Sequence, residues 1–208
     1  MIGDLFLEFA LLGAEWVLWL LILLSIVSVA VMVERWRFYR ARRIDLDALS
    51  KAARLAIDKG KDLDSDHADN PSLPAQVAVA AVKTAEQGPD VAGEAMNRAK
   101  ARGRRQYERL HPILGTLGSN APFIGLFGTV LGIVGAFNKL KENPEGGIDV
   151  VGGDLAEALV ATAMGILVAV PAVIAYNLFN RRMRTVLAST DEIAHDLLSA
   201  IHAKAKDQ

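Results

Sequence analysis

The chain has 208 residues, of which 52% are hydrophobic, with a formal net charge of -1 and no cysteine. This charge gives no support to a nucleic-acid partner, and the lack of cysteine excludes both a disulfide framework and a thiolate metal site. The apolar residues are gathered into three long blocks, a distribution that favours a membrane protein over a compact soluble domain.

The N-terminal half predicts one membrane span and a cytoplasmic insert. Residues 1–14 carry apolar side chains at helical spacing and predict an amphipathic helix in the outer membrane interface. Residues 15–34 predict the first transmembrane helix, because the run from Trp16 to Val33 has no charge and would be about 27 Å long as a helix. Residues 35–109 predict a cytoplasmic helical insert, which passes into the second span as one long helix with a kink at Pro112 or Pro122.

The C-terminal half predicts two further spans. Residues 110–139 form the second transmembrane helix, 140–153 a short periplasmic loop and 154–180 the third transmembrane helix. Residues 181–208 keep an apolar stripe at helical spacing and predict a cytoplasmic C-terminal helix. The fold class is therefore an all-α membrane protein with three transmembrane helices and long cytoplasmic helical extensions.

Basic residues set the orientation. Every arginine lies after the first span, before the second or after the third, and so on one side of the membrane. The only basic residues on the other side are Lys139 and Lys141. Since arginine and lysine near span ends stay mostly in the cytoplasm, we expect a periplasmic N-terminus and a cytoplasmic C-terminus. The same basic patches predict contacts with membrane lipid headgroups.

Small residues form a stripe along the second span. Glycines recur there at intervals of three, four and seven residues, and the four that we assign to close helix contact are Gly125, Gly128, Gly132 and Gly135. Glycines at this spacing let another helix approach closely in a membrane. Two interpretations stay open: packing between the second and third spans of one subunit, and an oligomer interface.

Glu157 is the acid at the start of the third span, followed by 23 residues without charge. An ionisable group near hydrocarbon is a candidate functional residue, although a snorkelling acid at the outer headgroups fits the composition as well. Thr129 lies beside the glycine stripe, and Thr162 lies about 140° around the helix from Glu157. Either threonine can line a path or bond its own helix backbone.

Two motifs carry a family resemblance. Residues 121–134 read APFIGLFGTVLGIV and residues 157–177 read EALVATAMGILVAVPAVIAYN. Together they resemble the signature of the MotA/TolQ/ExbB proton-channel family. The resemblance implies a bacterial inner-membrane motor subunit that assembles as a homopentamer around an ExbD/TolR-like single-span dimer, works on a TonB/TolA-like effector and uses protons as the coupling ion without another cofactor. It places Glu157, Thr162 and Thr129 on a pore-lining proton pathway, with an aspartate of the partner as the main proton carrier.

The function predicted from the sequence is that of a proton-channel or stator subunit, which couples proton flow to mechanical work in TonB-type import, a Tol-Pal system or a gliding-type system. The alternative is a passive oligomeric membrane scaffold in which Glu157 only anchors a helix. No nucleophile, phosphate-binding loop or metal cluster accompanies the acid, so neither an enzyme nor a metal site is predicted.

Overall fold

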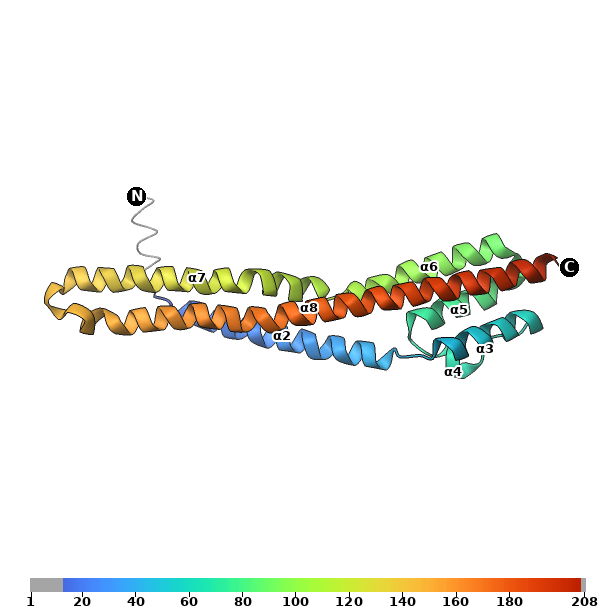
Figure 1. Cartoon of the computed structure of the whole chain (residues 1–208), viewed down its shortest axis with the longest axis horizontal. Helices are drawn as coiled ribbons and strands as arrows, with labels where there is room; N and C mark the ends of the chain where they lie inside the picture. Colours follow the sequence, from blue (N-terminus) through green and yellow to red (C-terminus); the bar gives the residue numbers. More distant parts are fainter. Residues whose placement is uncertain (1–12, 207–208) are drawn as a thin grey trace. The chain divides into compact units, whose positions relative to one another are not determined.

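The computed structural model describes residues 13–206, and this part of the chain is helical without any strand. The interfacial helix predicted at 1–14 therefore lies almost wholly outside the described residues. In chain order, the elements are the α-helices and 3-10 turns α2 (Glu15–Ala41), α3 (Leu46–Lys59), α4 (Ser65–Ala68), α5 (Leu73–Thr84), η1 (Ala85–Gln87), α6 (Pro89–Glu108), α7 (His111–Glu142), η2 (Pro144–Gly146) and α8 (Gly147–Lys206) (Figure 1).

Three stretches of the described chain are long and apolar enough to cross a membrane, judged by length and composition. They are Glu15–Ala41, Pro89–Glu142 and Pro144–Lys206. Each contains one predicted span, so the all-α class and the three apolar helices are confirmed.

The chain divides into two compact units. Unit 1 consists of Met1–Val33 and Leu110–Asn177, and unit 2 consists of Glu34–Arg109 and Leu178–Gln208. Helices α2 and α8 each contribute residues to both units.

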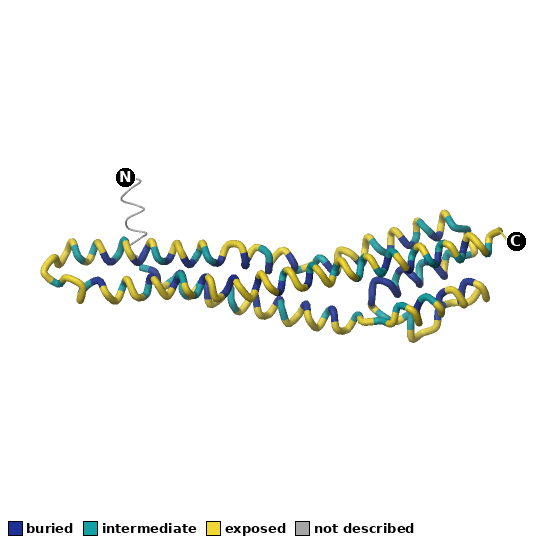
Figure 2. The backbone as a smooth tube through the Cα atoms, viewed as in Figure 1, coloured by how far each residue is buried: buried dark blue, intermediate teal, exposed yellow. Residues whose placement is uncertain are grey.

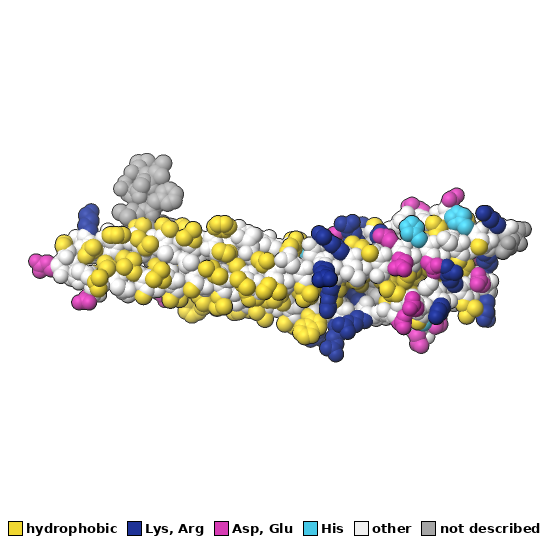
Figure 3. Space-filling view, viewed as in Figure 1, with side chains coloured by type: hydrophobic (Ala, Val, Ile, Leu, Met, Phe, Trp, Pro, Cys, Tyr) yellow, Lys and Arg dark blue, Asp and Glu magenta, His cyan; other side chains and the backbone are white. Residues whose placement is uncertain are grey.

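Unit 1 is built from α7 and the unit 1 parts of α2 and α8, and α7 and α8 run side by side (Figure 1). Its core contains Val17 and Leu21 from α2, Leu131 from α7 and Val168 from α8. Large apolar side chains also cover much of its visible outer face (Figure 3). That surface suits a hydrocarbon environment, or other apolar helices, better than water.

Unit 2 packs α3, α5, α6 and the C-terminal part of α8 around a core of their own, with buried positions recurring along each helix (Figure 2). Local capping sets the bounds of α3: Asp45 accepts hydrogen bonds from two main-chain N–H groups of the first turn, and Gly60 ends the helix in the left-handed conformation. Polar contacts join α3 to α8, where Asp196 accepts hydrogen bonds from Ser50 and Arg54.

The passage from the insert into the second span is a break between two helices, although one long helix was predicted. Helix α6 ends at Glu108 and α7 begins at His111, with Leu110 at φ 68°. Pro112 explains the break, because its ring has no N–H to donate and clashes with the carbonyl one turn earlier. The connection from α7 to α8 is also shorter than the predicted 140–153, since α7 continues through Glu142 and α8 begins at Gly147.

Candidate functional site

Helices α7 and α8 approach each other closely where two glycines meet. A Cβ atom added at Gly125 would lie 2.7 Å from the carbonyl oxygen of Ala161 and 3.1 Å from Cα of Gly165. A Cβ added at Gly165 would lie 2.7 Å from the carbonyl oxygen of Ala121 and 3.0 Å from Cα of Gly125. Ordinary contacts between carbon atoms are about 3.5–4.0 Å, so the two backbones touch where any larger side chain would separate them.

The glycine stripe continues along the same face of α7. An added Cβ at Gly128 would lie 2.8 Å from Cβ of Ala161, and one at Gly132 would lie 2.6 Å from Cβ of Ala158. At Gly135 the nearest atom would be 3.9 Å away, which is an ordinary contact. These contacts lie within one chain. The oligomer interface that the sequence also allowed at these glycines stays a prediction.

Two threonine hydroxyls meet at this crossing. Oγ1 of Thr129 on α7 contacts Oγ1 of Thr162 on α8 directly. Thr129 is also 3.1 Å from the carbonyl oxygen of Ala158, and both hydroxyls lie 3.3 Å from the carbonyl oxygen of Gly125. The glycines make this contact possible, because a hydroxyl reaches only one bond beyond Cβ and can cross between helices only where their backbones are close.

Glu157 lies beside this crossing on α8, where it lines a polar cavity of about 380 Å³. One of its carboxylate oxygens, Oε1, is buried and has no hydrogen-bond partner among residues 13–206. The cavity is also lined by Glu15, Glu142, Asp154 and Lys139, and Lys139 forms a 2.8 Å ion pair with Asp154. Four carboxylates around one ammonium group make an environment that attracts cations.

The structure therefore brings together Thr129 and Thr162, and it places Glu157 in a neighbouring cavity whose lining includes neither threonine. Gly132 and Gly135 line that cavity, so the glycine face of α7 extends from the threonine contact to the acid. The convergence of all three polar residues around one lumen stays a prediction.

Two features of the site were missed by the sequence analysis. One is Gly165, the partner of Gly125 on α8. Its signal was present, because Ala158, Ala161 and Gly165 form a small-residue stripe at intervals of three and four residues. The other is the ion pair between Lys139 and Asp154, for which the sequence carries no signal beyond the two charges.

The geometry supplies a chain of exchangeable hydrogen bonds between two membrane helices. A threonine hydroxyl can donate one hydrogen bond and accept others, so Thr162 can donate to Thr129 while Thr129 donates to the carbonyl of Ala158. Such a chain can reorient without leaving a fixed charge in hydrocarbon. No group of three or more acidic or histidine side chains arranged to hold a metal ion occurs in the described part of the chain.

Comparison with known proteins gives a family match over most of the region just described. A family model described as the MotA/TolQ/ExbB proton channel family matches residues 68–192. These residues include both threonines, Glu157 and the whole glycine stripe.

Individual relatives carry related names. A biopolymer transport protein ExbB of Xanthomonas campestris pv. campestris (strain B100) is 48% identical over 85 residues, which cover 41% of this chain and 34% of that protein. A Tol-Pal system protein TolQ of Pseudomonas aeruginosa is 39% identical over 110 residues, 53% of this chain and 48% of that protein. A biopolymer transport protein ExbB of Salmonella typhimurium is 32% identical over 189 residues, 86% of this chain and 77% of that protein. The chain thus spans about a third of the Xanthomonas relative and about three quarters of the Salmonella one.

Proposed function

Because the chain belongs to the MotA/TolQ/ExbB proton channel family, we propose that it is the proton-channel subunit of an ExbB–ExbD-like or TolQ–TolR-like motor. In this proposal five copies form a ring in the bacterial inner membrane, with the N-termini periplasmic and the C-termini cytoplasmic. The ring encloses the single spans of an ExbD/TolR-like dimer and drives a TonB/TolA-like effector.

The observation that carries the proposal is the contact between Thr129 and Thr162 across α7 and α8. The two hydroxyls, hydrogen-bonded to each other and to a main-chain carbonyl, provide a polar track between otherwise apolar helices. Glu157 lies on the same helix as Thr162 and lines the acidic cavity, which concentrates protons and other cations near the track.

Energy for the work comes from the membrane potential. One elementary charge that crosses the membrane releases about 2.3 kcal/mol per 100 mV, enough to bias a step of the partner helix between two ring contacts. Glu157 would serve as an accessory polar group, and the partner's carboxylate would carry the proton. Protons are the coupling ion, and the proposal requires no enzyme chemistry.

Proton flux tests the proposal. The full chain, co-purified with its single-span partner and reconstituted in liposomes, would be energised with a potassium diffusion potential while a pH dye reports inward flux. We expect Thr162→Val to lower the flux roughly tenfold or more, because the substitution keeps the shape and removes the group that relays the hydrogen bond.

Ser119→Ala is the matched control. The Ser119 hydroxyl lies in the second span and bonds only within its own helix: it donates to the carbonyl of Gly115, 3.0 Å away, and accepts from the side-chain amide of Asn120, 3.1 Å away. This control should leave the flux unchanged. An assembled Thr162→Val complex with full proton flux would contradict the pathway and favour the passive oligomeric scaffold.

A further inference from the structure

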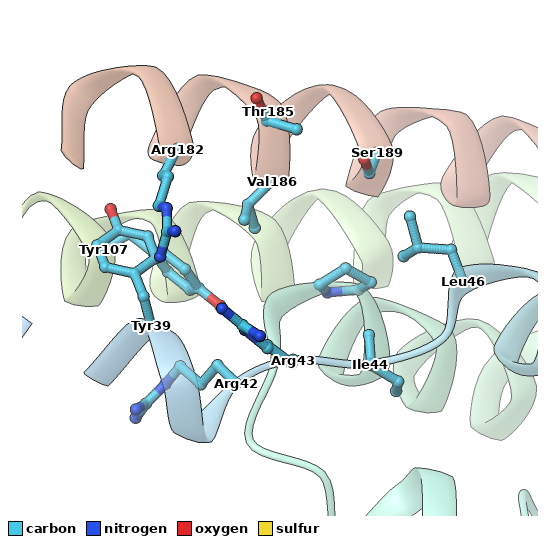
Figure 4. Close-up of a pocket in the computed structure, with 11 residues that line it drawn as sticks. Tyr39, Arg42, Arg43, Ile44, Leu46, Tyr107, Arg182, Thr185, Val186 and Ser189 are labelled. Carbon is cyan, nitrogen blue, oxygen red and sulfur yellow. The ribbon is translucent and has the colours of Figure 1, made fainter. Parts of the chain in front are cut away.

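A cavity in unit 2 has a lining that selects for negative charge. It has a volume of about 400 Å³ and is formed by α2, the segment after it, the start of α3, α5, α6 and α8 (Figure 4). Of the eleven described residues that line it, three are arginines and none is acidic: Arg42, Arg43 and Arg182.

Two of the three arginines are available to bind a ligand in the cavity. Arg42 is engaged, because its guanidinium lies 3.6 Å from the centroid of the Phe38 ring and donates to the carbonyl of Phe38. Arg43 and Arg182 are exposed and make no side-chain hydrogen bond or ion pair with any other residue from 13 to 206. They extend toward the tyrosines of the cavity from two different segments (Figure 4).

Tyr107 adds a buried donor without an acceptor. Its ring is 1% exposed, and its hydroxyl oxygen accepts a hydrogen bond from the N–H of Leu73, 3.4 Å away. The O–H hydrogen itself meets no acceptor among the described residues. Burial raises the pKa of Tyr107, so this hydroxyl stays protonated at neutral pH and requires an acceptor oxygen. Tyr39 differs, since its hydroxyl donates to the carbonyl of Phe179.

The residues of the cavity follow closely on the ends of two predicted spans, where lipid headgroups are expected. Tyr39 follows the end of the first predicted span by five residues on the same helix, and Arg182 follows the end of the third by two. At 1.5 Å per residue, both lie within about 8 Å of the end of a span, on the arginine-rich side. The wall of the cavity is apolar at Ile44, Leu46 and Val186, which suits the glycerol and first methylenes of a lipid.

From these contacts we propose that the cavity binds the phosphate group of an anionic phospholipid, such as phosphatidylglycerol, from the inner leaflet. Arg43 and Arg182 hold the phosphate oxygens, and the Tyr107 hydroxyl donates to one of them. The acyl chains leave along the apolar wall. This site shares no residue with the threonine contact, so it stands or fails independently of proton conduction.

Lipid binding to the intact chain tests the site. Native mass spectrometry of the detergent-solubilised protein, titrated with phosphatidylglycerol, should show a tight lipid adduct that phosphatidylcholine does not match. The double variant Arg43→Gln, Arg182→Gln should weaken the apparent affinity about tenfold or more, since each basic group near an anionic headgroup contributes several-fold. The matched control is Arg37→Gln, Arg184→Gln, which removes two exposed arginines next to the same spans but outside the cavity.

The outcomes separate a built site from general attraction. The control variant should stay within about twofold of the unmodified protein, and both variants should show the same helical circular dichroism. An equal loss in both variants, or equal retention of phosphatidylcholine, would overturn the site. Glycerol 1-phosphate serves as a soluble competitor that carries the same phosphate group. If it bound as tightly as phosphatidylglycerol, the ligand of the cavity would be a soluble phosphate and not a membrane lipid.

Discussion

Replacing Gly125 with alanine tests the helix crossing directly. The new Cβ would lie 2.7 Å from the carbonyl oxygen of Ala161 and 3.1 Å from the Cα atoms of Gly165 and Thr162. All three neighbours are backbone atoms, so no side chain can rotate away, and α8 must move by about 0.5–1 Å to restore normal contact. Overpacking of this kind costs about 1–3 kcal/mol, which outweighs the gain of up to about 1 kcal/mol in helix propensity from glycine to alanine.

The assay is the free energy of unfolding of the purified protein in mixed micelles, followed by circular dichroism. Gly135→Ala is the matched control, because it makes the same change on the same helix where the added Cβ would meet nothing closer than 3.9 Å. We expect the Gly125 variant to lose about 1–2 kcal/mol and the Gly135 variant to lose nothing or gain slightly. Equal stability of the two variants would refute steric contact as the reason for glycine at the crossing.

Three further predictions concern charged groups. Glu157→Gln should abolish transduction in a pathway assay while native mass spectrometry shows unchanged assembly, because the amide keeps the shape and removes only the charge; full activity would exclude a role in the proton path. Arg35→Leu should lower the free energy of unfolding by about 1–3 kcal/mol, since Arg35 is 1% exposed and donates to a main-chain carbonyl of α6. The hydrogen bond from Arg54 lowers the pKa of Asp196. The ionised Asp196 carboxylate therefore stabilises the fold above about pH 4, and this stabilisation is lost as the pH falls through the lowered pKa. Melting curves recorded from pH 7 downward should therefore show Asp196→Asn destabilised at neutral pH, with its difference from the unmodified protein shrinking as the pH falls below about 4. Glu192→Gln, at an exposed position on α8, should follow the unmodified protein throughout.

The sequence predicts the apolar helices well because hydrocarbon imposes a length and a composition on any span. The eighteen uncharged residues from Trp16 to Val33 lie wholly within α2 for this reason. Breaks in helices are harder to predict. The sequence predicts a kink at Pro112 or Pro122, but one helix ends at Glu108 and the next begins at His111. Pro112 then lies in the first turn of the new helix, where its missing N–H costs no hydrogen bond.

Relations across helices depend on rotation and crossing angle, which periodicity does not supply. The helical wheel separates Thr162 from Glu157, and in the structure Thr162 contacts α7 while Glu157 lines a cavity. The wheel does not tell which residue of α7 Thr162 meets. The contact between Arg54 and Asp196 joins residues 142 positions apart, and nothing in the sequence pairs these charges among the many others.

The helix packing and the hydrogen bonds of the threonine hydroxyls depend on each other at the crossing of α7 and α8. A test of the polar track therefore needs a substitution that changes the hydroxyl and leaves the packing intact. A hydroxyl on Thr129 reaches the carbonyl of Ala158 only because Gly125 and Gly165 let the backbones touch. A shift of α8 by 0.5–1 Å would stretch this 3.1 Å hydrogen bond beyond a useful length. A loss of proton flux in a Gly125 variant would therefore not tell whether the helix packing or the hydrogen bonds of the threonine hydroxyls had caused it. Thr162→Val removes the hydroxyl and leaves the glycine contact in place, so only this substitution assigns the defect to the polar track.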